Sequence, residues 1–259
     1  MSALTHCFST LGCPDLSVHE AAELAQAYGI QAIELRVISG SLDIPQALAA
    51  EFGDPAALGR WLENSPIRIA GFGTSARLFG DGNLGDLEQF LPWAEAALVP
   101  YLRIFDGGET LSDSDYVQAG EKLSRWQAER KRRGLTVDLM IETHDALAQP
   151  AQLSEFVTRL PTAAILWDAH HTWAKGGADP VATWRAIAPQ VVHVHVKDSV
   201  LRADGRHYVL PGQGDFPMAT LQPLLASAGP IPISLEWERH WHNELPPLDQ
   251  ALQAARSWW

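Results

Sequence analysis

Four short segments in the second half of the chain place acidic and histidine residues at the ends of strand-like apolar runs. They are residues 141–144 (IETH), 167–171 (WDAHH), 193–198 (HVHVKD) and 235–238 (LEWE). Carboxylates and imidazoles are side chains that bind divalent cations in mixed oxygen and nitrogen sites. If the strands are those of a barrel, their carboxyl ends bring these distant segments together. The pattern therefore predicts a divalent metal site.

We expect Glu142, Asp168, His195 and Glu236 to bind the ion. Three carboxylates and one imidazole suit Mn²⁺, Mg²⁺, Co²⁺ or Zn²⁺ and leave positions open for substrate oxygens, unlike a closed thiolate site. Glu238 shares a strand face with Glu236, and like charges that converge there repel unless a cation neutralises them. Separate salt bridges or surface acids are the alternative for each residue, but the four suitable strand ends favour a joint site.

Other polar residues of these segments are candidates for contacts with a substrate. They are His144, His171 and Lys197. A histidine near a strand end can instead be a hydrogen-bonded neighbour, and Lys197 can simply offset surplus negative charge. Arg36 and Arg103 are expected to pair with interior carboxylates such as Glu34.

The elements that position these residues alternate along the chain. Strand-like runs cover residues 4–10, 32–37, 67–74, 101–106, 136–144, 163–171, 191–198 and 231–238. Helix-like segments cover residues 18–28, 84–98, 116–133, 151–160, 180–187, 218–228 and 248–258, with a poorer candidate at 55–63. Eight strand-then-helix units predict a closed parallel α/β barrel, a single (β/α)8 TIM barrel over residues 1–259.

Helix boundaries support this count. Ser17 precedes one predicted helix with Glu20 three residues later, and Asp179 opens another before Pro180. Such residues cap helix amino ends. The longest irregular stretch is 199–217, which holds Arg202 and Arg206 and lies where barrel loops bind substrates.

Length and composition agree with one barrel. The chain has 259 residues, of which 46% are apolar and 19% charged, and a TIM barrel needs about 250. The formal net charge of −12 repels polyanions, so we expect no nucleic-acid partner. The basic run 130–133 ends a predicted helix, where cations favourably meet the helix dipole.

Cysteine usage and the amino-terminal region bear on the compartment. Cys7 and Cys13 are the two cysteines, too few for a dense disulfide framework. No Lys or Arg precedes Arg36, so the basic region of a secretory signal is missing, and no apolar run reaches the roughly 18 residues of a membrane helix. We expect a cytoplasmic protein with no membrane partner.

The chain resembles the sugar phosphate isomerase/epimerase family of xylose isomerase-like TIM barrels over nearly its whole length. Besides the four metal-bearing segments in family order, the resemblance includes residues 9–14 (STLGCP), 32–36 (AIELR) and 102–105 (LRIF). These features are specific for the superfamily and say little about the substrate.

The resemblance implies roles for particular residues. In ketose 3-epimerases of this superfamily, residues matching Glu142, Asp168, His195 and Glu236 bind one divalent ion. The two residues matching Glu142 and Glu236 exchange protons with the substrate from opposite faces. The residue matching His171, and an arginine beyond the strand-seven histidine, hold hydroxyls, and Arg202 and Arg206 both compete for that last role. The expected substrate is a sugar, sugar phosphate or related hydroxy-keto compound, which reacts through an enediolate.

Three alternatives stay open at this point. A dehydratase of the dehydroshikimate type uses the same single-metal shell and also begins by removing a proton next to a carbonyl. A non-catalytic sugar-binding barrel is a second alternative, which the intact ligand set disfavours. An apurinic endonuclease is the third alternative. Such enzymes need additional histidines on strands three and four, where this chain has Thr74 and Asp106, so the sequence disfavours it.

A homo-oligomer is compatible with the sequence, which does not determine the oligomeric state.

Overall fold

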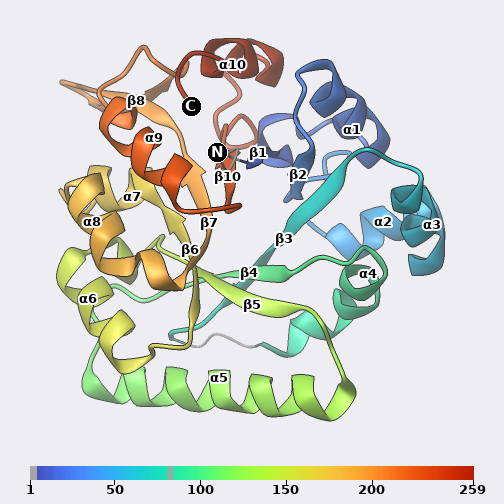
Figure 1. Ribbon diagram of the computed structural model, residues 1–259, viewed down its shortest axis with the longest axis horizontal. Helices are drawn as coiled ribbons and strands as arrows, with labels where there is room; N and C mark the ends of the chain where they lie inside the picture. The colour runs from blue at the N-terminus through green and yellow to red at the C-terminus, as the bar shows by residue number, and fades with distance from the viewer. Residues whose placement is uncertain (1–4, 81–83) are drawn as a thin grey trace.

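The computed structural model describes residues 5–80 and 84–259. Within these residues, eight parallel strands form a closed barrel in the order β1-β10-β7-β6-β5-β4-β3-β2 (Figure 1). The barrel strands are β1 Thr5–Ser9, β2 Ala32–Leu35, β3 Arg68–Arg77, β4 Tyr101–Phe105, β5 Asp138–Glu142, β6 Ala164–Asp168, β7 Val191–Val196 and β10 Pro232–Leu235. The predicted barrel of eight strands is confirmed.

Helices surround the barrel and complete the strand-then-helix alternation. They are α1 Val18–Ala27, α2 Ile44–Phe52, α3 Pro55–Glu63, α4 Leu91–Ala96, α5 Asp113–Arg133, α6 Pro150–Arg159, α7 Ala169–Ala174, α8 Pro180–Ile187, α9 Met218–Ser227 and α10 Leu248–Ala255. Short 3-10 turns lie at Thr10–Gly12, Gly85–Gln89, Ala146–Ala148 and Ala188–Gln190. Ser17 and Glu20 form the expected capping box of α1, and the Asp179 carboxylate caps α8.

Two helical segments differ from the prediction, one by being interrupted (84–98) and one by being more regular than expected (55–63). The first is a 3-10 turn followed by α4, and Pro92 lies in the first turn of α4, where its missing N–H costs nothing. The second is a regular helix, capped by the Asp54 carboxylate. The sequence patterns did not predict α2, which the Asp43 side chain caps.

The predicted strand ends are also corrected, and they position the polar residues. Leu4, the first residue of the predicted strand 4–10, lies outside the described residues. β6 ends at Asp168, and residues 169–171, predicted as strand, are the first turn of α7. The Asp168 carboxylate causes this change because it accepts the backbone N–H of His171 at 2.7 Å and caps the helix. Glu236 follows the last residue of β10 directly.

The segment 199–217, predicted to be irregular, contains an antiparallel hairpin of β8 Asp198–Arg202 and β9 Gly205–Val209. Figure 1 shows this hairpin in orange at the upper left. The buried Asp198 carboxylate fastens its base, since it accepts the backbone N–H groups of Ser199, Gly212, Gly214 and Phe216 at 2.9 to 3.1 Å. The hairpin therefore has a fixed place above the carboxyl end of β7.

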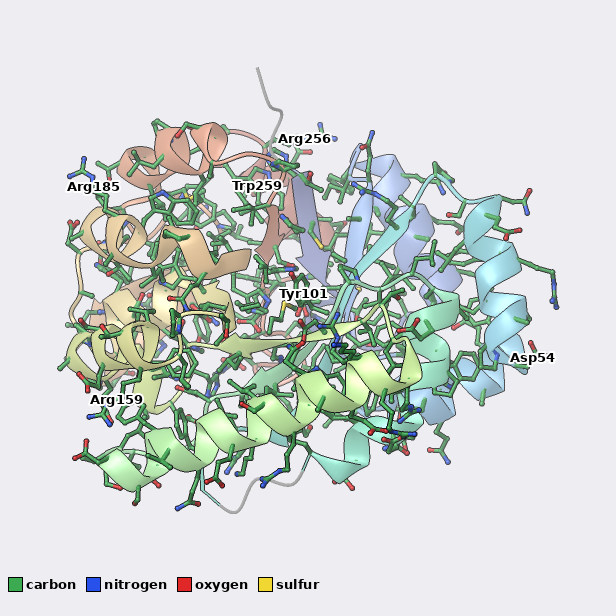
Figure 2. All side chains as sticks on the ribbon, turned by 60° about the horizontal axis from the view of Figure 1, so that its bottom comes forward. Asp54, Tyr101, Arg159, Arg185, Arg256 and Trp259 are labelled. Carbon is green, nitrogen blue, oxygen red and sulfur yellow. The ribbon has the colours of Figure 1, made fainter. Side chains whose placement is uncertain are left out.

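Contacts away from this end involve Trp259 and the basic run of α5. In Figure 2, Trp259 lies beside β1, and its ring stacks on His6 with 4.6 Å between centroids. Three arginines of the run at the end of α5 pair with acids: Arg130 with Asp138, Arg132 with Glu129, and Arg133 with Glu88.

Among the described helices, none has the length and apolarity of a membrane span.

Candidate metal centre

Glu142, Asp168, His195 and Glu236 converge at the carboxyl ends of four neighbouring strands. One ligand atom from each lies within 4.8 Å of all the others, and all four residues are buried. The strand register explains this, because Asp168 lies opposite His195 on β7, and His195 lies opposite Ser234 on β10. The structure thus brings together the four residues selected from the sequence.

The donor atoms of this group suit a cation. His195 Nδ1 lies 3.2 Å from Glu236 Oε1 and 3.7 Å from Glu142 Oε1. Both His195 Nδ1 and Glu142 Oε2 are buried, and their charged neighbours among the described residues, Glu236 and Arg103, do not reach them in hydrogen-bond geometry. Buried polar atoms without a hydrogen bond are costly. A divalent ion would satisfy these atoms by coordination, and this oxygen and nitrogen set fits Mn²⁺, Mg²⁺, Co²⁺ or Zn²⁺.

The other ring nitrogen of His195 contacts Glu34 on β2. His195 Nε2 lies 2.8 Å from Glu34 Oε2, which also accepts the Ser234 hydroxyl at 3.0 Å and lies 3.4 Å from His193 Nε2. Burial opposes charge on both groups. The carboxylates of Glu236 and Glu34 nevertheless raise the pKa of His195 well above its usual value, and His195 and His193 keep the pKa of Glu34 well below its own. This pairing fixes the ring so that Nδ1 faces the centre.

Arg103 pairs with an interior carboxylate as expected, although this acid is Glu142, whereas no ion pair forms between Arg36 and a described carboxylate. Arg103 Nε lies 3.2 Å from Glu142 Oε2, and its guanidinium stacks 3.9 Å above the Phe105 ring. Arg36 donates to the carbonyl of Gly73 at 3.4 Å. Burial and the nearby Arg103 lower the pKa of Arg36 to about 9, so it stays cationic at neutral pH. Glu34 instead pairs with the two histidines of β7.

Lys197 is completely buried between three carboxylates. Its Nζ lies 2.8 Å from Asp168 Oδ2 and 2.7 Å from Glu238 Oε1, and it also donates to Glu236. Burial disfavours the charge, but the three acids outweigh it and hold the pKa of Lys197 well above its usual value. The arrangement corresponds to the charge-offsetting role for Lys197 more closely than to an exposed substrate contact.

With the His195 imidazole neutral, the carboxylates around this centre exceed the fixed cations by two. Among the described residues, the carboxylates that contact the group or its direct partners are Glu34, Glu142, Asp168, Glu236 and Glu238. The fixed cations are Arg36, Arg103 and Lys197. One divalent ion closes the difference when the His195 imidazole is neutral, the form in which it binds metal.

The remaining histidine candidates lie next to the centre. His171 Nδ1 is 3.0 Å from Asp168 Oδ2, and His171 Nε2 is 4.0 Å from Glu238 Oε1. Burial lowers the pKa of His171, which favours the neutral ring. The His144 ring packs edge-on against His171 at 4.8 Å, and its Nδ1 lies 2.8 Å from Asp145 Oδ1. His144 is about one third exposed and so reaches toward solvent.

Both arginine candidates are exposed residues of the hairpin, but their contacts differ. The Arg206 guanidinium lies 4.5 Å from the centroid of the Trp173 ring and donates to the Ser199 hydroxyl at 3.1 Å. Arg202 pairs with Gly205 next to the hairpin turn and is exposed. Arg206 is therefore the arginine that contacts residues near the centre.

Sequence reasoning missed Tyr208 and did not foresee the roles of Glu34 and Glu238. The Tyr208 hydroxyl donates to Glu238 Oε1 at 2.8 Å. No pattern predicted Tyr208, because its strand lies in a segment that reads as irregular. For Glu34 a signal existed, since it is the single charged residue in the otherwise apolar run Ala32–Leu35.

The fold and this acidic centre define an α/β barrel with a candidate metal site at the carboxyl ends of its strands. Residues 22–259 match the model of the xylose isomerase-like TIM barrel family, and the chain belongs to this family. A search of curated proteins gives no significant match.

Solved structures with the same fold cover nearly the whole chain. A probable 3-DHS dehydratase, AsbF from Bacillus anthracis, has 17% identity and a TM-score of 0.76, and the match covers 96% of this chain and 97% of AsbF. The IolI protein with a bound zinc atom has 17% identity and a TM-score of 0.73, with coverage of 99% and 96%. A candidate sugar phosphate isomerase/epimerase from Anabaena variabilis has 13% identity and a TM-score of 0.66, with coverage of 99% and 97%. At these identities the similarity shows the fold.

Proposed function

We propose that the chain is a divalent-metal-dependent isomerase or epimerase. The proposed substrate is a sugar, sugar phosphate or related hydroxy-keto compound. The observation that carries the proposal is the convergence of Glu142 and Glu236 with Asp168 and His195 within 4.8 Å. The zinc-containing IolI structure with the same fold supports a metal in this kind of barrel.

Glu142 and Glu236 are the proposed acid and base. In the barrel order, β6 and β7 lie between β5, which carries Glu142, and β10, which Glu236 follows. The two carboxylates therefore border the ligand group on different sides and reach a substrate from different directions. Burial favours the neutral acids, but Arg103 keeps the pKa of Glu142 low and His195 and Lys197 keep that of Glu236 low. Both are thus carboxylates at neutral pH, the form that a base needs.

A bound ion would polarise the carbonyl oxygen and stabilise the negative charge that develops on it. One glutamate removes the proton from the carbon next to the carbonyl. The other glutamate first takes up a proton from solvent and then returns it to the opposite face, which gives an epimer, or to the neighbouring carbon, which gives an isomer. The first glutamate then releases its proton to solvent, so that protons balance over the cycle. General acid and base catalysis of this kind contributes about 10² to 10⁴ in rate. His171 and Arg206 are the proposed contacts for substrate hydroxyls.

Deuterium exchange tests this proposal. Candidate ketoses and hydroxy-keto acids are incubated with the metal-loaded protein in D₂O, and proton NMR follows the carbon next to each carbonyl. We expect exchange that a chelator stops and that is lost in Glu142→Gln and Glu236→Gln. Glu63→Gln removes the same charge from an exposed site at the amino end of the barrel and serves as control.

The outcomes separate the proposal from its alternatives. A product with a new conjugated double bond, detected by ultraviolet absorbance, would replace the isomerase by a dehydratase. If metal-loaded protein binds sugars but exchanges no proton, the chain is a binding protein. Near-native exchange in either glutamate variant with metal bound would refute the two-glutamate mechanism.

A further inference from the structure

Lys197 and a metal ion at the candidate centre would need the same carboxylates. The Lys197 ammonium has three donors and contacts Asp168, Glu236 and Glu238. Asp168 and Glu236 belong to the proposed ligand set, whereas Glu238 does not. Two of the three acceptors of a fully buried charge are thus also the residues that would bind the ion.

The competition centres on one oxygen of Asp168. Asp168 Oδ1 accepts the backbone N–H of His171 at 2.7 Å as a helix cap. Asp168 Oδ2 is the oxygen that Lys197 Nζ approaches at 2.8 Å and His171 Nδ1 at 3.0 Å. An ion that binds Asp168 through Oδ2 therefore weakens the contact between Asp168 and Lys197. A buried ammonium that loses its acceptors is costly unless another carboxylate keeps it paired.

Glu238 is placed to keep this pairing. Its Oε1 lies 2.7 Å from Lys197 Nζ and accepts the Tyr208 hydroxyl at 2.8 Å. Tyr208 lies on β9, and its ring centroid is 5.8 Å from Lys197 Nζ. The hydroxyl holds the Glu238 carboxylate beside the ammonium from outside the ligand group.

We propose that Glu238 and Tyr208 form a receiving pair that keeps the Lys197 ammonium paired when a divalent ion takes Asp168 and Glu236. This inference rests on the proposed metal centre. Lys197 holds the two ligand carboxylates together before the ion binds, and then shifts its contacts toward Glu238. Glu238 and Tyr208 are positioning residues that set metal affinity without binding the metal.

A double-mutant cycle of metal affinity tests the receiving pair. Mn²⁺ and Zn²⁺ are titrated separately, without substrate, into the metal-free full-length protein by calorimetry, and circular dichroism checks the fold of each variant. We expect Glu238→Gln to weaken binding by about 10- to 100-fold, as is typical for groups that orient metal ligands. In the Lys197→Met background, the factor by which Glu238→Gln weakens binding should be at least about tenfold smaller, because Glu238 no longer has an ammonium to pair with. The control Glu63→Gln should leave affinity within about twofold.

The cycle separates pairing from simple charge attraction. If Glu238 only attracted the ion by its negative charge, Glu238→Gln would weaken binding equally in both backgrounds, and that result would overturn the proposal. A wild-type protein that binds neither ion would refute the metal centre itself, whereas binding without coupling between Lys197 and Glu238 refutes only the receiving pair.

A second variant covers the case in which Lys197→Met does not fold. Tyr208→Phe keeps every charge and removes the hydroxyl that orients Glu238. We expect it to weaken metal binding by about three- to tenfold, the worth of one hydrogen bond. Unchanged affinity in Tyr208→Phe would overturn the receiving pair.

Discussion

His195 Nε2 lies 2.8 Å from Glu34 Oε2, so the imidazole is held from inside the barrel while its Nδ1 faces the candidate centre. A carboxylate that accepts from the second nitrogen of a metal-binding histidine fixes the ring and increases its basicity. The two residues lie 161 positions apart in the sequence, and closure of the barrel brings them together.

The first prediction concerns this contact. Glu34→Gln keeps the shape of the side chain and removes the charge that orients and polarises His195. We expect metal affinity to fall by about 10- to 100-fold, measured by calorimetric titration with Mn²⁺ or Zn²⁺. The number of ions bound per chain should not change. Unaltered affinity in a folded Glu34→Gln protein would show that His195 does not depend on Glu34.

The second prediction concerns Arg103, which is buried beside Glu142. Arg103→Met leaves the Glu142 carboxylate without its cation. Breaking a buried ion pair in this way costs about 3–5 kcal/mol, and we expect a loss of that size in the free energy of unfolding by urea. The control Arg132→Met breaks an exposed pair with Glu129 on α5 and should change stability by no more than about 1 kcal/mol. Equal effects in both variants would contradict a special role for the pair of Arg103 and Glu142.

The third prediction concerns the base of the hairpin. Asp198→Ala removes the acceptor of four backbone N–H groups. Because each unpaired buried donor costs about 1–3 kcal/mol, we expect the variant to lose at least about 2 kcal/mol of unfolding free energy. Hydrogen exchange should become faster in residues 199–216. Asp204→Ala, which removes an exposed acid near the hairpin turn, should stay within about 0.5 kcal/mol. Slow exchange in Asp198→Ala would mean that other contacts hold the hairpin.

Most of the fold and the four-residue group could be predicted from the sequence. Each strand is a short apolar run, and the alternation of strands and helices leaves a parallel barrel as the simplest closure. Once the strands are parallel, polar residues at their carboxyl ends must meet. The grouping of Glu142, Asp168, His195 and Glu236 therefore follows from the sequence.

The remaining features depend on packing between distant elements. Residues 199–217 show no regular alternation of apolar and polar residues that would predict the hairpin of β8 and β9. The contact between Tyr208 and Glu238 therefore does not follow from the sequence. The sequence predicts that Arg103 pairs with an interior carboxylate but does not determine which one. The register of β4 against β5 places Phe105 opposite Glu142, and the Arg103 side chain lies beside that acid. The strand-like pattern continues over residues 169–171, but the Asp168 carboxylate caps α7 and thereby ends β6.

The central claim is that Glu142, Asp168, His195 and Glu236 together bind one divalent ion. The most direct test is calorimetric titration of chelator-treated protein with Mn²⁺ and Zn²⁺, with thermal unfolding measured alongside. We predict one ion per chain, and at 100 times the dissociation constant a stabilisation of about 2.7 kcal/mol. Binding should be lost in His195→Ala. A protein that binds no ion, or a folded His195→Ala variant that binds it as tightly as the wild type, would contradict the proposed metal centre.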